Sequence, residues 1–433
     1  MHDLSSDQVQ TLGAEMHEMM TRLFPICRSL TGNGVRETFA ILQDVIGLDV
    51  HEVPSGTKCF DWTVPDEWNI KDAYVKTPDG RRVIDFQESN LHVMGYSTPI
   101  DAEMSLEDLR PHLYADPSLP HAIPYLTSYY QRRWGFCLSQ EALDAMPPGP
   151  YEVKIDSSLE PGSLTYAETL IPGDSEEEIL LSTNVCHPSL ANNELSGPVL
   201  TAFLARHIAR LPRRRYSYRI VFVPETIGML AYLDRNLDAM RSKVVGGYHV
   251  VCVGGPGDFT YIQSRNADCL TDKVTAHILK HACDNASIDS YSLRGSDERQ
   301  LCAPGIDLPI GTLTKTKFEN YPEYHTSLDD LDYVRPEHMG TAFDVYCQCL
   351  GLLEQNHHYK VTQLGEPNLG SRGLWPTIGG QAYRQELVHQ LLALLAYADG
   401  ENDLIDIAER HDMQASVLYP VAETLHEKGL LEK

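Results

Sequence analysis

The sequence is poor in basic residues and lacks any long apolar run. Its 433 residues include 61 acidic and 35 basic side chains, a formal net charge of −26. This charge repels nucleic acid and anionic membranes at long range. No run of about 18 apolar residues could span a bilayer, and the opening MHDLSSDQVQ has neither the basic nor the apolar region of a signal peptide. We therefore expect a cytoplasmic protein with no nucleic-acid or membrane partner.

Closely paired cysteines are also absent. The ten cysteines are scattered along the chain and form no CxxC pair. Without such pairs or a secretory context, neither a disulfide framework nor a structural zinc knuckle is predicted. Most of the thiols should be reduced and buried.

The chain is long enough for about two or three domains. Apolar residues at helical spacing predict a helical hairpin over residues 8–48, and short alternating runs broken by Pro, Gly and Asp predict a small β module over 51–135. From about residue 148, β-branched runs alternate with amphipathic helices, which is typical of an α/β sheet covered on both faces. We predict one α/β domain formed by 1–50 and 136–366, with 51–135 inserted.

The C-terminal region follows a linker rich in Gly and Pro, residues 367–380. Three short helices and a terminal turn then resemble a winged helix-turn-helix, predicted over 376–433. Residues 381–433 contain four basic and ten acidic side chains, a net charge of −6. A DNA reader would present a basic face, so a docking or lid role is favoured over DNA binding.

Three segments place chemically useful side chains next to predicted strands or turns. ILLSTNVCHPSLANNELSG delivers His187 at a strand end, RIVFVPETIG delivers Glu225 at another, and FENYPEYHTSLDDLDYV contains His325. Chemistry in open α/β sheets gathers at the carboxyl ends of the strands. Imidazole and carboxylate groups suit a zinc site with an open position for water, beside which a Glu can act as general base. Each residue also has a structural alternative: a hydrogen-bonded His, a Glu at a helix N-terminus, and an exposed acidic loop.

The order of these landmarks resembles that in zinc aminopeptidases of the leucyl aminopeptidase and glutamate carboxypeptidase type. The landmarks are His187, ANNELSG, VPETIG, YHVVCVGG, RGSDERQLCAPGIDLP and YHTSLDD. Over nearly the whole chain the sequence is most similar to the bacterial aminopeptidase-like domain family, often associated with polysaccharide or secondary-metabolite gene clusters. The resemblance implies a mixed central β-sheet flanked by helices, with a small β module and a C-terminal winged helix.

The resemblance also implies roles for individual residues. His187 and His325 would bind zinc and Glu225 would be the general base, whereas Asn193 replaces a metal-bridging Asp and Cys252 replaces a further metal Asp. Thr226 stands where the peptidases carry a second Glu. Because an amide oxygen is a weaker donor than a carboxylate, one zinc ion is expected rather than two, with Cys252 or Glu225 completing the ligand set.

Substrate contacts are assigned to residues near the presumed cleft. Arg265 or Arg294 would bind an anionic group of a small substrate, although Arg294 could equally pair with Asp297 or Glu298. Asp297 and Tyr324 are further candidates for substrate binding.

Cys186 is expected to be structural. Adjacent strand residues face opposite sides, so it could contact His187 only if the strand breaks before it.

The sequence thus predicts a zinc-dependent amide or peptide hydrolase acting on a small or short peptide substrate. The alternative is a peptidase-fold protein that has lost hydrolysis and serves as a binding or docking module. The sequence leaves open whether the protein forms a homo-oligomer.

Overall fold

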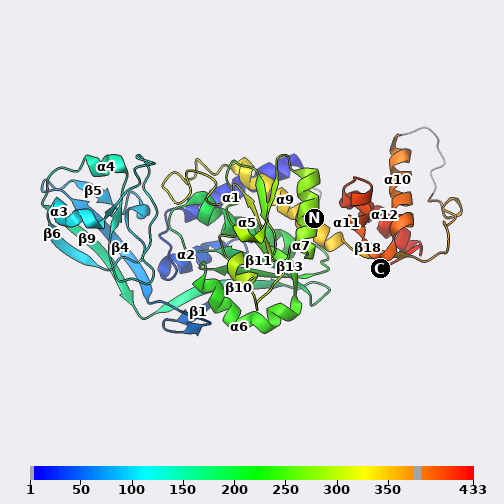
Figure 1. Ribbon diagram of the computed structural model, residues 1–433, viewed down its shortest axis with the longest axis horizontal. Helices are drawn as coiled ribbons and strands as arrows, with labels where there is room; N and C mark the ends of the chain where they lie inside the picture. The colour runs from blue at the N-terminus through cyan, green and yellow to red at the C-terminus, as the bar shows by residue number, and fades with distance from the viewer. Residues whose placement is uncertain (1–3, 375–381) are drawn as a thin grey trace.

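The computed structural model describes residues 4–374 and 382–433. A small β module lies at one end of the molecule, a large sheet between helices lies in the centre, and a C-terminal module lies at the other end (Figure 1). Of the described helices, none is both long and apolar enough to cross a membrane.

The central sheet has eight strands and is mixed, in agreement with the predicted fold class. Strands β12, β11, β13 and β16 run parallel, whereas β1, β10 and β14 each run antiparallel to a neighbour. In spatial order the strands are β1 (Asp49–Pro54), β10 (Ser163–Ile171), β12 (Ser217–Val223), β11 (Glu178–Asn184), β13 (Val244–His249), β16 (Gly311–Lys315), β14 (Phe259–Ile262) and β15 (Ser287–Asp289).

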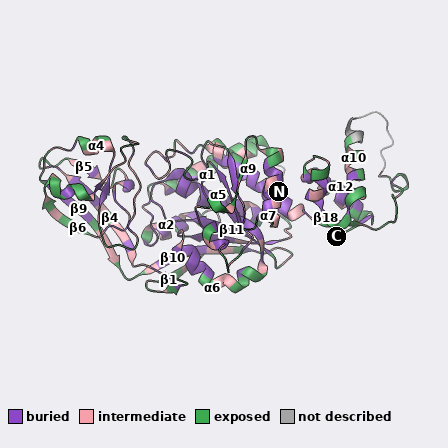
Figure 2. Ribbon diagram, in the orientation of Figure 1, coloured by how far each residue is buried: buried purple, intermediate pink, exposed green. Residues whose placement is uncertain are grey.

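Helices cover both faces of this sheet because its central strands are apolar on both sides. In β11, Ile179 and Leu181 pack into one apolar cluster and Leu180 packs into another. The first cluster includes residues of α1 (Ser6–Leu23), α2 (Asn33–Leu42), α5 (Ser196–Arg210), α7 (Leu270–Ala282) and α9 (Pro336–Gln355), and the second includes α6 (Ile227–Lys243). Figure 2 shows the buried residues concentrated in this central region.

The parallel strands end at one edge of the sheet, which sets the place of the candidate site. β11 ends at Asn184, β12 at Val223 and β13 at His249. Residues that directly follow these strands are therefore brought together although they are distant in sequence.

The small β module contains a four-stranded antiparallel sheet. Its order is β5 (Arg82–Asp85), β4 (Glu67–Lys76), β9 (Tyr151–Glu160) and β6 (Ile100–Met104). Short elements complete it: α3 (Leu106–Leu109), β7 (Leu113–Tyr114), β8 (Phe136–Cys137) and α4 (Gln140–Asp144). The hairpin of β2 (Lys58–Cys59) and β3 (Trp62–Thr63) precedes this sheet in the chain and packs against α6 of the central domain. The predicted domain boundary between residues 135 and 136 stays a prediction. β9 lies after that boundary in the chain but pairs with β4 and β6 of the small sheet, so strand pairing crosses the boundary. At the other boundary, β1 belongs to the central sheet as far as Pro54.

The C-terminal module combines helices with a three-stranded sheet. Its elements are β17 (His358–Val361), α10 (Ala382–Tyr397), β18 (Asp399–Asp403), α11 (Leu404–Arg410), α12 (Ala415–Glu427) and β19 (Leu431–Glu432). β17 pairs with β18 and β19, so this sheet begins before the predicted linker. Residues 375–380 of that linker, and the predicted domain start at 376, lie outside the described residues.

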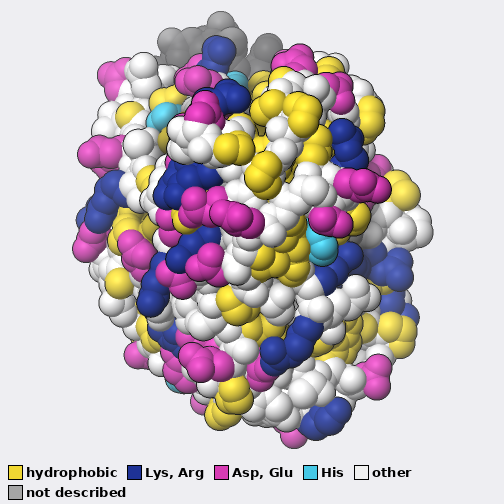
Figure 3. Space-filling view, turned by 90° about the vertical axis from the view of Figure 1, so that its left-hand side faces the viewer, with side chains coloured by type: hydrophobic (Ala, Val, Ile, Leu, Met, Phe, Trp, Pro, Cys, Tyr) yellow, Lys and Arg dark blue, Asp and Glu magenta, His cyan; other side chains and the backbone are white. Residues whose placement is uncertain are grey.

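The surface of the small β module carries charges of both signs. Viewed from that end of the molecule, acidic and basic side chains are interspersed among apolar patches (Figure 3). Such a mixed face lacks the single-sign field that steers polyanions.

Candidate metal centre

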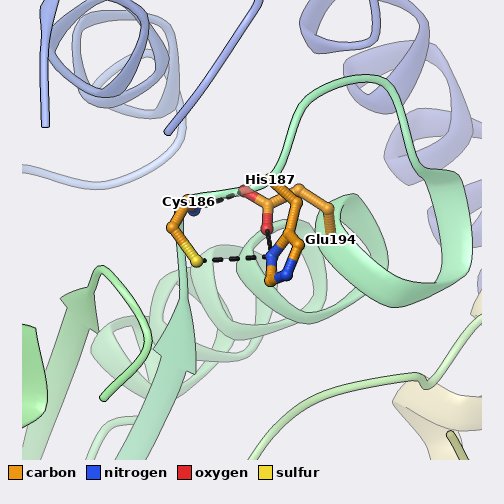
Figure 4. A group of neighbouring side chains, drawn as sticks. All are labelled: Cys186, His187 and Glu194. Atoms are coloured by element: carbon orange, nitrogen blue, oxygen red, sulfur yellow. Dashed lines mark hydrogen bonds and ion pairs between the residues drawn. The ribbon is translucent and has the colours of Figure 1, made fainter. Parts of the chain in front are cut away.

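His187 is held at the carboxyl end of β11 by a glutamate that sequence reasoning did not single out. Glu194, from a π-helical turn at Ala191–Leu195, accepts from the backbone N–H of Cys186 (2.8 Å) and lies 3.1 Å from His187 Nδ1 (Figure 4). A carboxylate on one ring nitrogen fixes the orientation of the imidazole and leaves the other nitrogen for a ligand. That nitrogen, Nε2, lies 4.0 Å from Oε2 of Glu225.

A buried arginine supports this arrangement from the segment after α1. Arg28 Nε lies 3.2 Å from Glu194 Oε1, and neither side chain has any exposed surface. The guanidinium also donates to the carbonyls of His187 (2.9 Å) and Leu23 (2.8 Å). Burial lowers the pKa of Arg28, and Glu194 opposes that effect. The ion pair therefore ties the His187 loop to the N-terminal helices.

Cys186 contacts His187 because β11 ends before it. The strand stops at Asn184, which meets the condition set by the sequence argument, and Cys186 Sγ lies 3.3 Å from His187 Nδ1. Burial raises the pKa of this thiol to about 11. A buried thiol in its neutral form is not an activated nucleophile, so the contact supports a structural role.

Glu225 is presented by a strained turn between β12 and α6. The N–H of Ile227 donates to the carbonyl of Glu225 (2.8 Å), and Thr226 has φ 63° and ψ −79°, which together define a classic γ-turn. Such a backbone is unfavourable for a β-branched residue and is stabilised here by a bond from Thr226 N to Asp297 Oδ1 (2.8 Å). Strain of this kind concentrates at functional sites.

His325 is brought to His187 by the loop after β16. Their ring centroids are 5.4 Å apart, and Tyr125 of the inserted segment lies 5.1 Å from each. The N–H of Tyr125 donates to the carbonyl of His325 (2.8 Å), and the ring of Tyr324 stacks on that of His325 at 3.9 Å. Burial, reinforced by His187, lowers the pKa of His325 to about 3, so its ring is neutral. Within the described residues, its Nε2 is buried and has no hydrogen-bond partner.

Asn193 and Cys252 also lie together at this edge. Asn193 Nδ2 is 3.9 Å from Cys252 Sγ, and Asn193 Oδ1 is buried without a partner among the described residues. Asp329 fixes this turn by accepting from the backbone N–H groups of Asn192 (2.6 Å) and Asn193 (2.9 Å), and burial raises its pKa to about 6. The thiol of Cys252 is fully buried, and burial raises its pKa.

The structure does not bring the two predicted arginines to this cluster. Arg265 is exposed and pairs with Asp307, and Arg294 is exposed with its guanidinium 4.7 Å from the ring centre of Tyr291. Arg299, which sequence reasoning missed, lies 3.9 Å from Glu225 instead.

Asp297 is fully buried and supports the γ-turn, which leaves it no exposed surface for a substrate. Burial and the neighbouring Glu225 raise its pKa well above its usual range.

A second group of potential metal ligands joins α7 to the C-terminal module: His277, His281 and Glu409. His277 uses both ring nitrogens, because Nδ1 lies 2.5 Å from Glu409 and Nε2 accepts from Ala415 N (2.9 Å). Lys280 Nζ is also 2.7 Å from Glu409. These contacts fit a structural link between α7 and the C-terminal module better than they fit a metal site.

Comparison with known protein families identifies two matching family models. A family model described as a domain of unknown function, DUF4910, matches residues 17–356. The chain belongs to this family. A second family model, described as winged helix-turn-helix, matches residues 357–433, which agrees with the pairing of β17.

A sequence relative and a solved structure, both from Clostridium acetobutylicum, match this DUF4910 protein over nearly its whole length. A Clostridium acetobutylicum protein described as a candidate polysaccharide biosynthesis protein with an aminopeptidase-like domain is 43% identical over 421 residues, covering 97% of this chain and 96% of the relative. A crystal structure of a candidate peptidase from Clostridium acetobutylicum has a TM-score of 0.93 at 42% identity and covers 98% of this chain and 97% of its own. A zinc aminopeptidase from Bacillus subtilis has a TM-score of 0.55 at 11% identity, with 79% and 94% covered. The last likeness shows the aminopeptidase fold.

Proposed function

We propose that this protein is a zinc-dependent hydrolase of amide or peptide bonds that acts on a small, anionic substrate. The observation that carries the proposal is a pair of buried atoms that have no partner among the described residues, His325 Nε2 and Asn193 Oδ1, at the sheet edge where Glu194 orients the His187 imidazole. Most buried polar atoms in proteins have a hydrogen-bond partner, so these two atoms, at the same sheet edge as His187, are candidates for binding an ion. The imidazoles of His187 and His325 and the amide oxygen of Asn193 fit one zinc ion, and Cys252 lies close enough to Asn193 to assist.

Each residue of the site has a separate role in the proposed reaction. When bound, zinc supplies Lewis acidity to a substrate carbonyl and to water. Glu225 has one oxygen directed toward His187 and is placed to accept the proton of the attacking water and return it to the leaving amine. Arg299, with its side chain 41% exposed, takes the anionic group of the substrate in place of the two arginines predicted from sequence. Tyr324 packs against His325 and forms part of the wall.

Metal content tests this proposal. We expect about one zinc per chain in the purified protein, and loss of that zinc in both His187→Ala and His325→Ala, because each removes an imidazole donor. Elemental analysis after dialysis gives the stoichiometry. His281→Ala is the matched control, since it removes a histidine from the interdomain group and should leave the zinc in place. A zinc content that follows His281 instead, or no zinc at all, contradicts the proposal.

The alternative function is a binding or docking module without hydrolysis. It is favoured by Asn193 and Thr226, which stand where the related peptidases carry carboxylates. A broad screen of amide substrates that finds no zinc-dependent activity in a folded, zinc-loaded protein would support it.

The winged helix-turn-helix is proposed to dock on the rest of the protein rather than on DNA. Helix-turn-helix proteins read bases with the N-terminal residues of their second helix. Here Ala415, the first residue of α12, is buried and donates to His277 of α7, and Lys273 of α7 pairs with Asp403 and Asp406 (both 2.7 Å).

We therefore expect no salt-dependent binding of a fluorescein-labelled DNA duplex, because this end of α12 is occupied and the module is acidic. Fluorescence anisotropy between low and physiological salt measures it. An anisotropy rise that weakens with added salt would show that the module binds DNA.

The proposed setting is the cytoplasm, in polysaccharide or secondary-metabolite biosynthesis. Its support is the description of the Clostridium acetobutylicum relative and the charge and hydropathy of the chain. A homo-oligomer is compatible with this setting, and light scattering of the purified protein determines the oligomeric state.

A further inference from the structure

A buried chain of hydrogen bonds lies behind Glu225. Ser296 Oγ donates to Glu225 Oε1 (3.0 Å), and the same hydroxyl oxygen lies 2.9 Å from His249 Nε2 and 2.9 Å from Asn184 Nδ2. The far side of the imidazole, His249 Nδ1, lies 3.1 Å from Ser182 Oγ. The chain thus connects two central strands, β11 and β13, to the proposed general base.

The direction of each bond follows from the donors available. An ionised carboxylate can only accept, so the single hydrogen of the Ser296 hydroxyl is directed at Glu225. The two remaining acceptor positions of that oxygen are then filled by the amide of Asn184 and by Nε2–H of His249. With Nε2 protonated, the neutral imidazole accepts from Ser182 at Nδ1. Each member therefore has one role, and the Ser296 hydroxyl cannot turn away from Glu225 without losing a partner.

Burial makes this arrangement rigid. Ser182 and His249 have no exposed surface, and Ser296 is 4% exposed. Burial also lowers the pKa of His249 to about 4, which keeps the ring neutral. The turn that carries Ser296 is fixed by Glu298, whose Oε1 accepts from the N–H groups of Gly295 (2.7 Å) and Ser296 (3.0 Å). Polar groups this deeply buried exchange partners only at high cost.

From this geometry we infer that Ser296 is a positioning residue for the general base. It holds Oε1 of Glu225 so that Oε2 faces His187, and His249 fixes the direction in which the hydroxyl donates. The inference rests on the proposed hydrolytic function for its kinetic consequence, but its structural consequence is independent of that function.

The test is the Ser296→Ala variant in the full-length protein. We expect a parent-like zinc content, a parent-like KM and a kcat lowered about 10- to 100-fold for aspartyl- and glutamyl-4-nitroanilides, which carry the proposed anionic group, because one hydrogen bond to a charged group is lost. A crystal structure of the variant should show the Glu225 carboxylate turned from its parent position. Ser296→Cys keeps a weak donor of similar size and should give an intermediate kcat, and it replaces the alanine variant if that variant does not fold.

Thr183→Val is the matched control. It removes a buried hydroxyl from β11, one that donates to the carbonyl of Val250 (2.8 Å) and not to Glu225, and it should leave both kcat and the Glu225 position unchanged. An unmoved Glu225 carboxylate in Ser296→Ala, or a kcat equal to that of the parent, overturns the inference. If the zinc-loaded parent hydrolyses no probe, the proposed function fails, and the position of Glu225 in the variant still decides the inference.

Discussion

Replacing Glu225 by glutamine is expected to lower kcat for amide hydrolysis by about 10²- to 10⁴-fold, the usual contribution of a positioned general base. Glutamine has the same shape as glutamate and its oxygen can still accept from Ser296, but it cannot take a proton from water. Because Glu225 is proposed as base and not as ligand, zinc content should be retained. Steady-state kinetics with aspartyl- and glutamyl-4-nitroanilides and elemental analysis of the same samples measure the two quantities.

Glu323→Gln provides the matched control, since it alters a carboxylate in the segment that leads into His325 and should keep the parental kcat. Two results would count against the assigned role. A Glu225→Gln protein that loses zinc together with activity would make Glu225 a ligand, and a protein with undiminished kcat would require a different base.

Replacing Arg28 by methionine is expected to destabilise the protein by about 3–5 kcal/mol, because it leaves the charge of Glu194 buried without its partner. The loss should be visible as a lower midpoint of urea unfolding. Since Arg28 also donates to the carbonyl of His187, zinc affinity should fall in the same variant. Adding Glu194→Gln to Arg28→Met should recover part of the stability, because the unpaired charge is then removed.

Arg22→Met is the control for this change. Arg22 also pairs with a carboxylate, Asp44 (2.7 Å), but the two side chains are 47% and 59% exposed. Exposed pairs contribute at most about 1 kcal/mol. Equal effects of the two substitutions would show that the buried pair has no special role in stability.

The fold class and the centre of the site could be predicted from the sequence because both depend on where the apolar strands lie and where they end. Apolar runs of the type in β11 predict buried parallel strands, and the residues directly after them meet at one edge. This reasoning locates His187 and Glu225, whereas His325 stands in a polar run and is identified by the resemblance, which also supplies the roles of all three. Glu194 was within reach of the same reasoning, as a carboxylate seven residues after His187 that must enter a buried turn.

The contacts that support the site could not be predicted from the sequence because they join residues that are far apart in the chain. Nothing near Arg28 indicates that its guanidinium is buried against Glu194, and His249 looks like any polar residue in a strand. Arg294 and Arg299 lie in the same short segment, RGSDERQ, and only the turn fixed by Glu298 determines that Arg299 faces Glu225. The contact between Cys186 and His187 depends on the residue at which β11 ends, and sequence patterns locate a strand end only to within about 2–4 residues.

The chain enters and leaves the small β module at neighbouring points, so the module could be removed without breaking the central sheet. Pro54 of β1 and Ser163 of β10 are paired neighbours in the central sheet, so residues 55–162 depart and return at a single point. A short turn could join the two strands into an ordinary hairpin without changing the strand order of the central sheet. The shortened chain would lack Tyr125 and the bridge between Pro124 and Thr326, and with them the roof over His325. The insertion therefore covers His325 from one side, and its removal would expose that residue while the central strands beneath it keep their order.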